Sequence, residues 1–217
     1  YQPRVSDEER GMTLLEVKNI HVYGLNESCA ASGYPMKSNE PNPAECTDKD
    51  IARMKRLGSS PSGSGHDCAL KGIIVQFDLK APVKVWTEAE RYHWFDIVSS
   101  QSTMHRLSKM DIKSCMDESV DNRMVDIMME LQNDYLVKQE IAKQTGNEKA
   151  TKAAKQAYLK LLLSCPVGLN LTARVSTNYL QLKTIYRQRK NHRLPHWYVF
   201  CDAIEKLPYA KDFGVVD

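Results

Sequence analysis

The stretch GIIVQFDLKAP, residues 72–82, is the clearest strand in this sequence, and the fold class follows from it. Ile73 to Leu79 are mostly β-branched or apolar residues, the composition that favours a buried strand. Pro82 has no amide hydrogen with which to continue a ladder, so we expect the strand to end there. Because the run is apolar along its length, we expect it to lie in the centre of a sheet.

A capping-box pattern follows this strand, with Thr87 and then Glu90 three residues later. It predicts a helix through EAERYHWFDIV, residues 88–98, whose aromatic content indicates burial on more than one side. This helix would present the polar stretch IVSSQSTMHRLSKM, residues 97–110, which holds hydroxyls at Ser99, Ser100, Ser102 and Thr103, an amide at Gln101, and cations at Arg106 and Lys109. These groups suit a phosphate or the edge of a heterocycle, although an ordinary polar loop has the same composition.

The remaining segments alternate between strand and helix patterns. Thr47 and Asp50 form a further capping box, and Asn26 is a candidate helix cap. Residues 58–65, GSSPSGSG, predict a flexible loop without the GK[ST] ending of a phosphate-binding loop. Periodicity predicts strands over 13–24 and 169–176, and helices over 25–33, 47–57, 120–143, 149–164, 178–190 and 194–207. The pattern indicates a fold of mixed helices and strands without internal repeats.

Length and composition are typical of one soluble globular domain. The chain has 217 residues, of which 42% are hydrophobic and 26% charged, and no apolar run approaches the ~20 residues that span a bilayer. Residues 1–11, YQPRVSDEERG, have no apolar core of a secretion signal and are expected to be an extension or a cloning remnant. We therefore expect a single domain over residues 12–217 and a cytoplasmic location.

The cysteines and the net charge exclude two classes of site. The six cysteines are scattered without a CxxC pair, so we expect reduced thiols, most of them in the core, and no metal site. The net charge of +3 is too small for bulk nucleic-acid binding. One basic run, YRQRKNHR at residues 186–193, is the only candidate for such binding, which is the least favoured function.

Within that run, Arg189 differs from its neighbours. It continues the apolar stripe of Leu182, Ile185 and Tyr186 on its helix, so it should point inward and requires an anion. The anion is either an internal carboxylate or a ligand phosphate or carboxylate, since a guanidinium serves both. Lys183, Arg187 and Lys190 lie largely on other faces of this helix, where we expect them to be solvated.

Two further polar residues are candidates with open roles. Asn178 either shares the inward stripe or caps the helix, and His66 either meets a ligand at the start of the central strand or lies on the surface. No Ser-His-Asp order, glycosidase carboxylate pair or GxGxxG motif is present. The residues therefore do not indicate unaided acid–base chemistry.

Three blocks together resemble the flavin-dependent thymidylate synthases in order and approximate spacing: GHDCALKGIIVQFDLKAP (65–82), IVSSQSTMHRLSKM (97–110) and CPVGLNLTARVSTNYLQLKTIYRQR (165–189) followed by PHW (195–197). The resemblance covers roughly residues 13–207. It implies an α/β (α+β) fold with a central, mainly antiparallel sheet and a helical bundle, assembled as a homotetramer. It also implies FAD and dUMP bound where subunits meet, with methylenetetrahydrofolate and NADPH as co-substrates. Because the flavin would supply the hard chemistry, the missing catalytic triad is expected.

The resemblance assigns roles to individual residues. Arg189 matches the arginine that meets the pyrimidine ring of dUMP, which makes it the catalytic candidate. The cofactor-binding candidates are His66, Cys68, Ser102, Asn178 and Thr184, and the substrate-binding candidates are Arg91, Ser99, Gln101, Ser102, Arg106 and Arg189. No metal ligand is implied.

The family signature RHRxxSxNExSxR is only partly kept. The first serine, the asparagine and the final arginine of the signature are matched by Ser99, Gln101 and Arg106. The Arg-His-Arg segment is replaced by Trp94-Phe95-Asp96, the glutamate by Ser102 and the second serine by Met104. In a separate N-x-R motif, Leu180 replaces the arginine. These changes remove cations that would face an anionic flavin or phosphate. The implied function is reductive one-carbon transfer to a pyrimidine nucleotide, and the alternative is a non-catalytic, nucleotide-binding sensor or assembly module.

Overall fold

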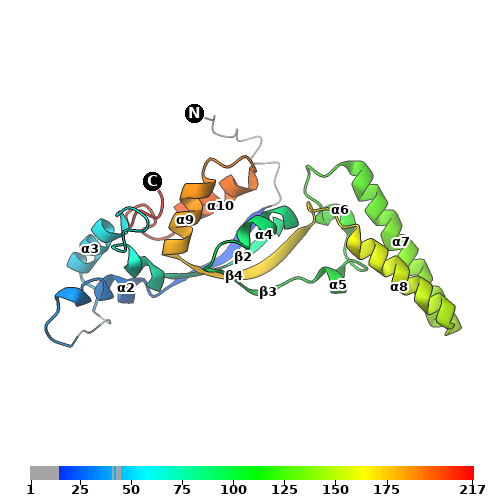
Figure 1. Cartoon of the computed structure of the whole chain (residues 1–217), viewed down its shortest axis with the longest axis horizontal. Helices are drawn as coiled ribbons and strands as arrows, with labels where there is room; N and C mark the ends of the chain where they lie inside the picture. The colour runs from blue at the N-terminus through cyan, green and yellow to red at the C-terminus, as the bar shows by residue number, and fades with distance from the viewer. Residues whose placement is uncertain (1–14, 41, 43–44) are drawn as a thin grey trace.

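The computed structural model describes residues 15–40, 42 and 45–217. Within them, four strands form one antiparallel sheet with the order β1-β2-β4-β3 (Figure 1). The strands are β1 (Glu16–Tyr23), β2 (Ile74–Pro82), β3 (Phe95–Ser100) and β4 (Asn170–Asn178). The α-helices are α2 (Leu25–Ala31), α3 (Asp48–Gly58), α4 (Val83–Ala89), α5 (Thr103–Arg106), α6 (Ile112–Cys115), α7 (Asn122–Thr145), α8 (Glu148–Leu163), α9 (Tyr179–Arg189) and α10 (His196–Glu205); two 3₁₀ helices are η1 (Tyr34–Met36) and η2 (Cys68–Gly72).

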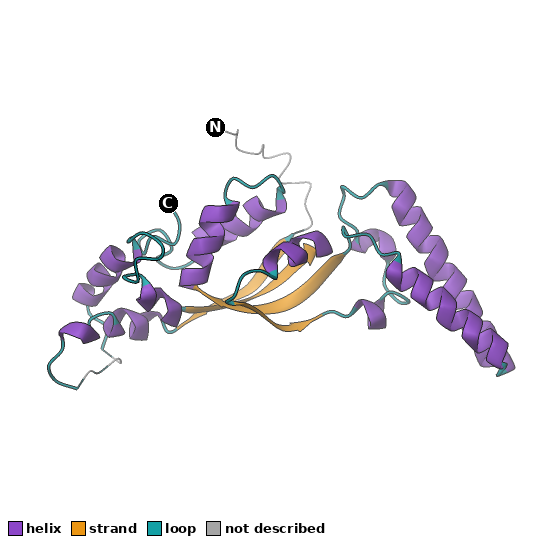
Figure 2. Cartoon of the chain, in the orientation of Figure 1, coloured by secondary structure: helices purple, strands orange, loops and turns teal. Residues whose placement is uncertain are grey.

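Strand β2 is central, as its composition predicts. It pairs with β1 on one side and with β4 on the other, from Ile74 opposite Asn178 to Pro82 opposite Asn170. Its alternate residues Val75, Phe77 and Leu79 are buried, because side chains alternate between the two faces of a strand. Helices α4, α9 and α10 cover this apolar face (Figure 2). The resulting core is rich in aromatic contacts, such as Phe77 against Phe200 with ring centroids 5.7 Å apart.

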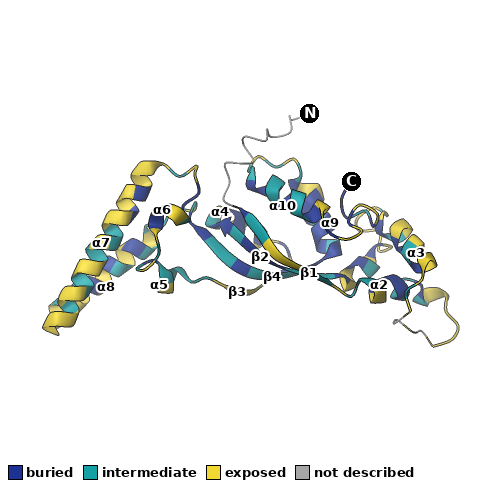
Figure 3. Ribbon diagram, turned by 180° about the vertical axis from the view of Figure 1, so that it is seen from behind, coloured by how far each residue is buried: buried dark blue, intermediate teal, exposed yellow. Residues whose placement is uncertain are grey.

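A helical hairpin projects from one end of the sheet, and α2 and α3 lie at the other end, which makes the molecule elongated (Figure 1). Helices α7 and α8 form the hairpin around a turn at Gly146, whose φ of 61° is left-handed. Of the 24 residues of α7, only Val125 and Met128 are buried. Most of the hairpin surface is exposed (Figure 3). A second apolar cluster of buried residues, including Leu107, Leu161 and Leu169, lies at its base.

The helix predicted over residues 88–98 is wrong. Helix α4 begins directly after Pro82, whose φ of −66° suits a helix start, and Thr87 lies inside it with Oγ1 bonded to the carbonyl of Lys84. Residues 95–100 instead form edge strand β3, paired with β4. Burial of Phe95 in the core and pairing with β4 outweigh the local helical signal, which is how tertiary contacts override propensity.

Two smaller predictions also need correction. Helix α2 is capped by Gly24, with a φ of 71°, and not by Asn26. All six cysteines are free, but only Cys29 and Cys201 are buried, so most of the thiols lie outside the core interior. The proposed extension, residues 1–11, and the first two residues of the predicted strand 13–24 lie outside the described residues. In the part that is described, no helix has the length and apolar character needed to cross a membrane.

Candidate functional site

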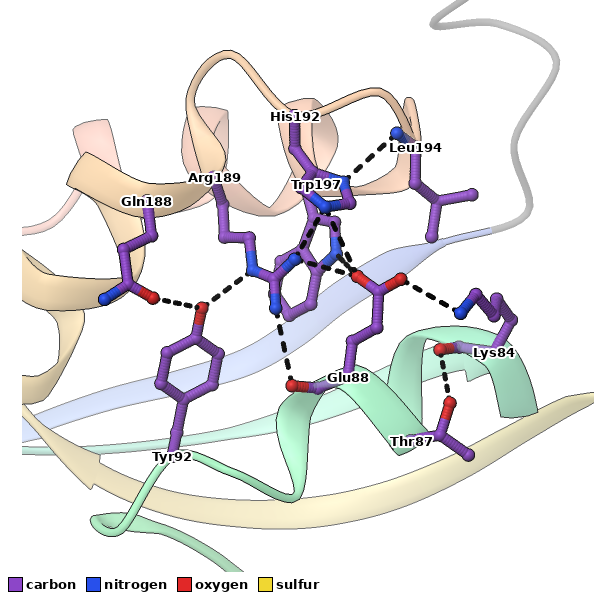
Figure 4. A network of polar contacts seen from close by, with 9 residues as sticks. All are labelled: Lys84, Thr87, Glu88, Tyr92, Gln188, Arg189, His192, Leu194 and Trp197. Carbon is purple, nitrogen blue, oxygen red and sulfur yellow. Dashed lines mark hydrogen bonds and ion pairs between the residues drawn. The ribbon is translucent and has the colours of Figure 1, made fainter.

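Arg189 lies inside a polar network that joins α4, α9 and α10 (Figure 4). Its side chain is 2% exposed, which confirms the inward orientation predicted from the helical stripe. Nη1 donates to Oε2 of Glu88 at 2.8 Å, and Nε donates to the hydroxyl of Tyr92 at 2.7 Å. The guanidinium carbon lies 4.5 Å from the ring centroid of Trp197, a cation–π distance. Of the two anions left open by the sequence, the structure shows the internal carboxylate.

The charge of Arg189 is balanced within this network. Burial alone would raise the pKa of Glu88, but hydrogen bonds from Trp197 and Lys84 and the nearby positive charges outweigh it, so its pKa lies below the ordinary value. Burial and the charge of Arg189 lower the pKa of His192, which lies 2.8 Å from Nη1. Glu88 is therefore ionised at neutral pH, and His192 is mostly uncharged.

Two cofactor candidates, His66 and Cys68, line one cavity of about 610 Å³ between α2, α3 and η2, here called the α2–α3 pocket. The lining residues are Ser28, Ala31, Ser32, Pro35, Met36, Arg53, Arg56, Leu57, Gly65, His66, Cys68, Ala69 and Gly72. The wall is mainly apolar, it carries two arginines, and no carboxylate lines it. Such a cavity suits an apolar ring that bears an anionic group.

A second cavity, of about 630 Å³, lies against α9 and is here called the α9 pocket. It brings together Arg91, the substrate candidate, and Thr184, the cofactor candidate, with Tyr92, His93, Gln181 and Gln188. The two amides lie seven residues apart on one face of α9. Each already accepts a hydrogen bond from the wall: Gln181 from the amide of Trp94 at 3.3 Å, and Gln188 from the Tyr92 hydroxyl at 3.1 Å. Their amide nitrogens retain donors suited to a carbonyl or a phosphate.

The remaining substrate candidates lie apart from both cavities, at the end of β3 and in α5. Gln101 is held against β4 by two hydrogen bonds. Its backbone amide donates to the carbonyl of Thr172 at 2.9 Å, and its side-chain Oε1 accepts from the backbone amide of Thr172 at 3.1 Å. Arg106 also donates to this Oε1. Ser99 is exposed and Ser102 is half-buried. The polar stretch is thus partly tied to the sheet.

Asn178 is a helix cap, one of its two predicted roles. It is buried, and its Oδ1 accepts from the amide of Gln181 at 2.9 Å, which caps α9. The expected solvation of Lys183 is wrong. Its Nζ is fully buried and donates to Asp67 and to the carbonyls of Gly58 and Ser60, each at 2.7 Å, so a distant carboxylate and the loop after α3 satisfy its charge.

Sequence reasoning missed Arg53 and Arg56 in the α2–α3 pocket and Glu88 as the partner of Arg189. The two arginines are three residues apart in DIARMKRL, so helical periodicity places them on one face, a signal that was available. Glu88 had no such signal, because its partner is about a hundred residues away. Among the described residues no cluster of His, Cys, Asp and Glu could hold a metal ion.

Solved structures resemble the chain over most of its length. Thymidylate Synthase X (ThyX) from Helicobacter pylori with FAD and dUMP matches at TM-score 0.64 and 14% identity, covering 93% of this chain and 97% of that one. Another Helicobacter pylori structure, of flavin-dependent thymidylate synthase ThyX complexed with FAD and dUMP, matches at TM-score 0.61 and 15% identity, covering 92% and 97%. PolB, a UMP/dUMP methylase from Streptomyces cacaoi bound with 5-Br dUMP, matches at TM-score 0.57 and 13% identity, covering 93% of each chain.

No family model matches the chain, and no curated protein matches it. At 13–15% identity, the structural likeness shows the fold alone. The chain has the fold of ThyX, which confirms the predicted fold class and the resemblance seen in the sequence.

Proposed function

We propose that this chain binds a flavin and a pyrimidine nucleotide and uses them in reductive one-carbon transfer to the pyrimidine ring. The observation that carries the proposal is the α2–α3 pocket, which brings His66 and Cys68 together with two arginines and no lining carboxylate. The Helicobacter pylori structures of this fold hold FAD and dUMP, and the Streptomyces cacaoi relative is a UMP/dUMP methylase. These ligands agree with the chemistry of the pocket.

The residues present fit a flavin. In the α2–α3 pocket, Ala31, Pro35 and Leu57 offer an apolar wall, and the Cys68 thiol and the His66 ring offer polar edges. A bound flavin would supply the hydride, and the chain would orient it and exclude water. NADPH and methylenetetrahydrofolate remain the proposed co-substrates, and FAD the proposed form of the flavin.

The α9 pocket is the proposed place of the nucleotide. Arg91 would pair with its phosphate, and the amide nitrogens of Gln181 and Gln188 would donate to ring carbonyls, with Thr184 at the cofactor side. We keep Ser99, Gln101, Ser102 and Arg106 as proposed substrate contacts from the end of β3. In this proposal Arg189 does not contact the nucleotide. It positions Tyr92, a residue that lines the α9 pocket, by donating a hydrogen bond to its hydroxyl.

A non-catalytic, nucleotide-binding member is the second candidate, and a specific observation favours it. Arg189, the catalytic candidate, is neutralised by Glu88, and Asp96 is exposed on β3 where the signature has an arginine. An exposed carboxylate repels anionic ligands. Such a protein would act as a sensor or assembly module and would keep the nucleotide pocket without flavin chemistry.

We further propose that the chain assembles with itself, as a homotetramer. The hairpin exposes apolar side chains that a soluble protein rarely leaves uncovered together, among them Ile127, Val137, Ile141, Leu159 and Leu163. Burial of such residues between copies is the usual basis of an obligate interface. The free cysteines agree with a reducing compartment, and we keep the cytoplasm as the proposed location.

The purified protein tests the proposal directly. We expect the visible absorption of a flavin, or saturable uptake of added FAD, followed by a methylated product from dUMP when NADPH and methylenetetrahydrofolate are supplied. Thermal stabilisation by dUMP without flavin binding or NADPH oxidation would favour the non-catalytic candidate. A protein that binds neither flavin nor nucleotide would contradict both.

A further inference from the structure

Arg53 and Arg56 of α3 differ in how their charges are balanced, although both line the α2–α3 pocket. Nη1 of Arg53 donates to Oδ1 of Asp50 at 2.6 Å, which neutralises this arginine within α3. Its guanidinium also packs against Gly33, where an added Cβ would lie 2.4 Å from Nη1. Arg53 is thus a fixed part of the wall.

Arg56 lies one helical turn further on and has no such partner. Its side chain is exposed, and across the described ranges 15–40, 42 and 45–217 no carboxylate lies within ion-pair distance of it. Asp67 precedes Cys68, which lines the opposite wall of the pocket. The Asp67 side chain does not face the pocket, because it is buried in an ion pair with Lys183. An anion in the pocket would therefore meet Arg56 without competition from an acidic side chain.

The apolar part of the wall defines what such an anion is attached to. Ala31, Pro35, Met36 and Leu57 lie on the same cavity as Arg56 and offer contact to a ring system. A free inorganic anion gains nothing from these side chains, whereas a ring that carries a phosphate contacts both parts of the wall. The lining thus favours a phosphorylated ring compound over a bare ion.

We propose that Arg56 is the phosphate-binding residue of the α2–α3 pocket and selects the phosphorylated forms of the ring ligand, FMN and FAD, over riboflavin. This inference rests on the proposed flavin binding for the identity of the ring, and on the pocket for the anion.

The test compares dissociation constants of FAD, FMN and riboflavin, from quenching of flavin fluorescence, for the native chain and Arg56→Gln. We expect the variant to bind FMN and FAD at least about tenfold more weakly, which corresponds to about 1.4 kcal/mol, and to bind riboflavin unchanged. The matched control is Arg123→Gln, which removes an exposed arginine of α7 at the opposite end of the molecule and should change none of the three constants (Figure 1).

A second arm measures stabilisation by inorganic pyrophosphate in thermal unfolding, because this probe does not depend on flavin binding. We expect pyrophosphate to raise the melting temperature of the native chain and of Arg123→Gln, and not that of Arg56→Gln. If this holds while no flavin binds, the proposed function fails and the phosphate site stands. The role of Arg56 is refuted, while flavin binding stands, in either of two cases. In the first, Arg56→Gln binds FAD, FMN and riboflavin more weakly by the same factor. In the second, neither the three dissociation constants nor the effect of pyrophosphate on the melting temperature differs from the native chain. Absence of both flavin and pyrophosphate binding in the native chain refutes both.

Discussion

At the scale of single residues, Arg189 shows how a buried charge is satisfied inside the chain. Glu88 accepts from it, Tyr92 bonds its Nε, and Trp197 stacks on it while donating to the same carboxylate oxygen at 2.8 Å. Three helices on one face of the sheet meet in this contact. Loss of Glu88 would leave the buried Arg189 without its carboxylate, and loss of Arg189 would remove the bonds to Glu88 and Tyr92 and the packing against Trp197, so either change is far more costly than loss of a surface pair.

We expect Arg189→Ala to lower the free energy of unfolding by about 3–5 kcal/mol, measured by chemical denaturation at neutral pH. Arg187→Ala is the matched control, since Arg187 is exposed on the same helix and bonds only Ser62 among the described residues; its effect should stay below about 1 kcal/mol. Adding Glu88→Gln to Arg189→Ala should cost less than the sum of the two single changes, because both remove the same pair. Unchanged stability together with lost nucleotide binding would instead show that Arg189 faces a ligand.

At the scale of elements, α3 is fixed by a local signal that the sequence displays. Thr47 and Asp50 form the predicted capping box: the Thr47 amide donates to Asp50 at 3.0 Å, and the Asp50 amide donates to the Thr47 hydroxyl at 3.4 Å. Hydrogen bonds from Thr47 and then from Arg53 lower the pKa of Asp50 to about 2. The start of the helix that carries Arg53 and Arg56 is therefore an ionised, hydrogen-bonded carboxylate.

This lowered pKa predicts a pH dependence of stability. Because the pKa of Asp50 is lower in the folded chain than its ordinary 3.8, its contribution is complete above about pH 4 and is lost as the pH falls to about 2. We expect Asp50→Asn to lower the free energy of unfolding by about 1 kcal/mol at pH 6, and the difference from the native chain to shrink toward zero near pH 2. Urea unfolding of both proteins across this range measures it. A difference that is constant with pH would contradict the role of the charge.

The segment after α4 shows the limit of local signals. Residues 95–98 lie in the helix predicted from the capping box at Thr87, yet residues 95–100 form β3, because Thr177 donates its hydroxyl to the carbonyl of Trp94 at 2.5 Å and β4 offers an unpaired edge. Phe95 is also buried against Phe77 and Phe200. None of these partners is near in sequence, so the residues around position 95 do not by themselves show that this segment forms a strand.

At the scale of the whole molecule, an elongated shape separates two apolar clusters, one under the sheet and one at the base of the hairpin. Leu171 packs against both clusters, and Nε2 of buried His196 lies 2.7 Å from Asp117, which joins the hairpin base to α10. We therefore propose that residues 12–217 unfold as one domain. The hairpin itself has little burial, and its exposed apolar side chains are the ones on which the proposed self-assembly rests.

The proposed self-assembly predicts that Ile141→Glu weakens the oligomer. Ile141 is 46% exposed on α7, and burial of such a side chain at an interface stabilises by about 1.5–3 kcal/mol. We expect the dissociation constant of the oligomer, from light scattering after size exclusion, to rise at least about tenfold with the helical content unchanged. Asn39→Glu, which adds the same charge at an exposed polar position in the loop after η1, away from the hairpin, should leave assembly intact. A native chain that is monomeric at all concentrations would contradict the proposal.

The sequence by itself determined the central strand, most helices, the cap at Thr47 and the inward direction of Arg189, because periodicity and capping act within a few residues. It offered the cap at Asn178 only as one of two roles, and the structure decided between them. The resemblance in three blocks added the antiparallel arrangement of the sheet and the helical bundle. Only the tertiary structure decided that residues 95–100 pair as an edge strand, that Lys183 is buried against Asp67, that Glu88 neutralises Arg189, and that Arg56 shares a cavity with His66 and Cys68. Each of these depends on a partner far away in the chain, and burial and pairing with such partners are decided only when the whole core is packed.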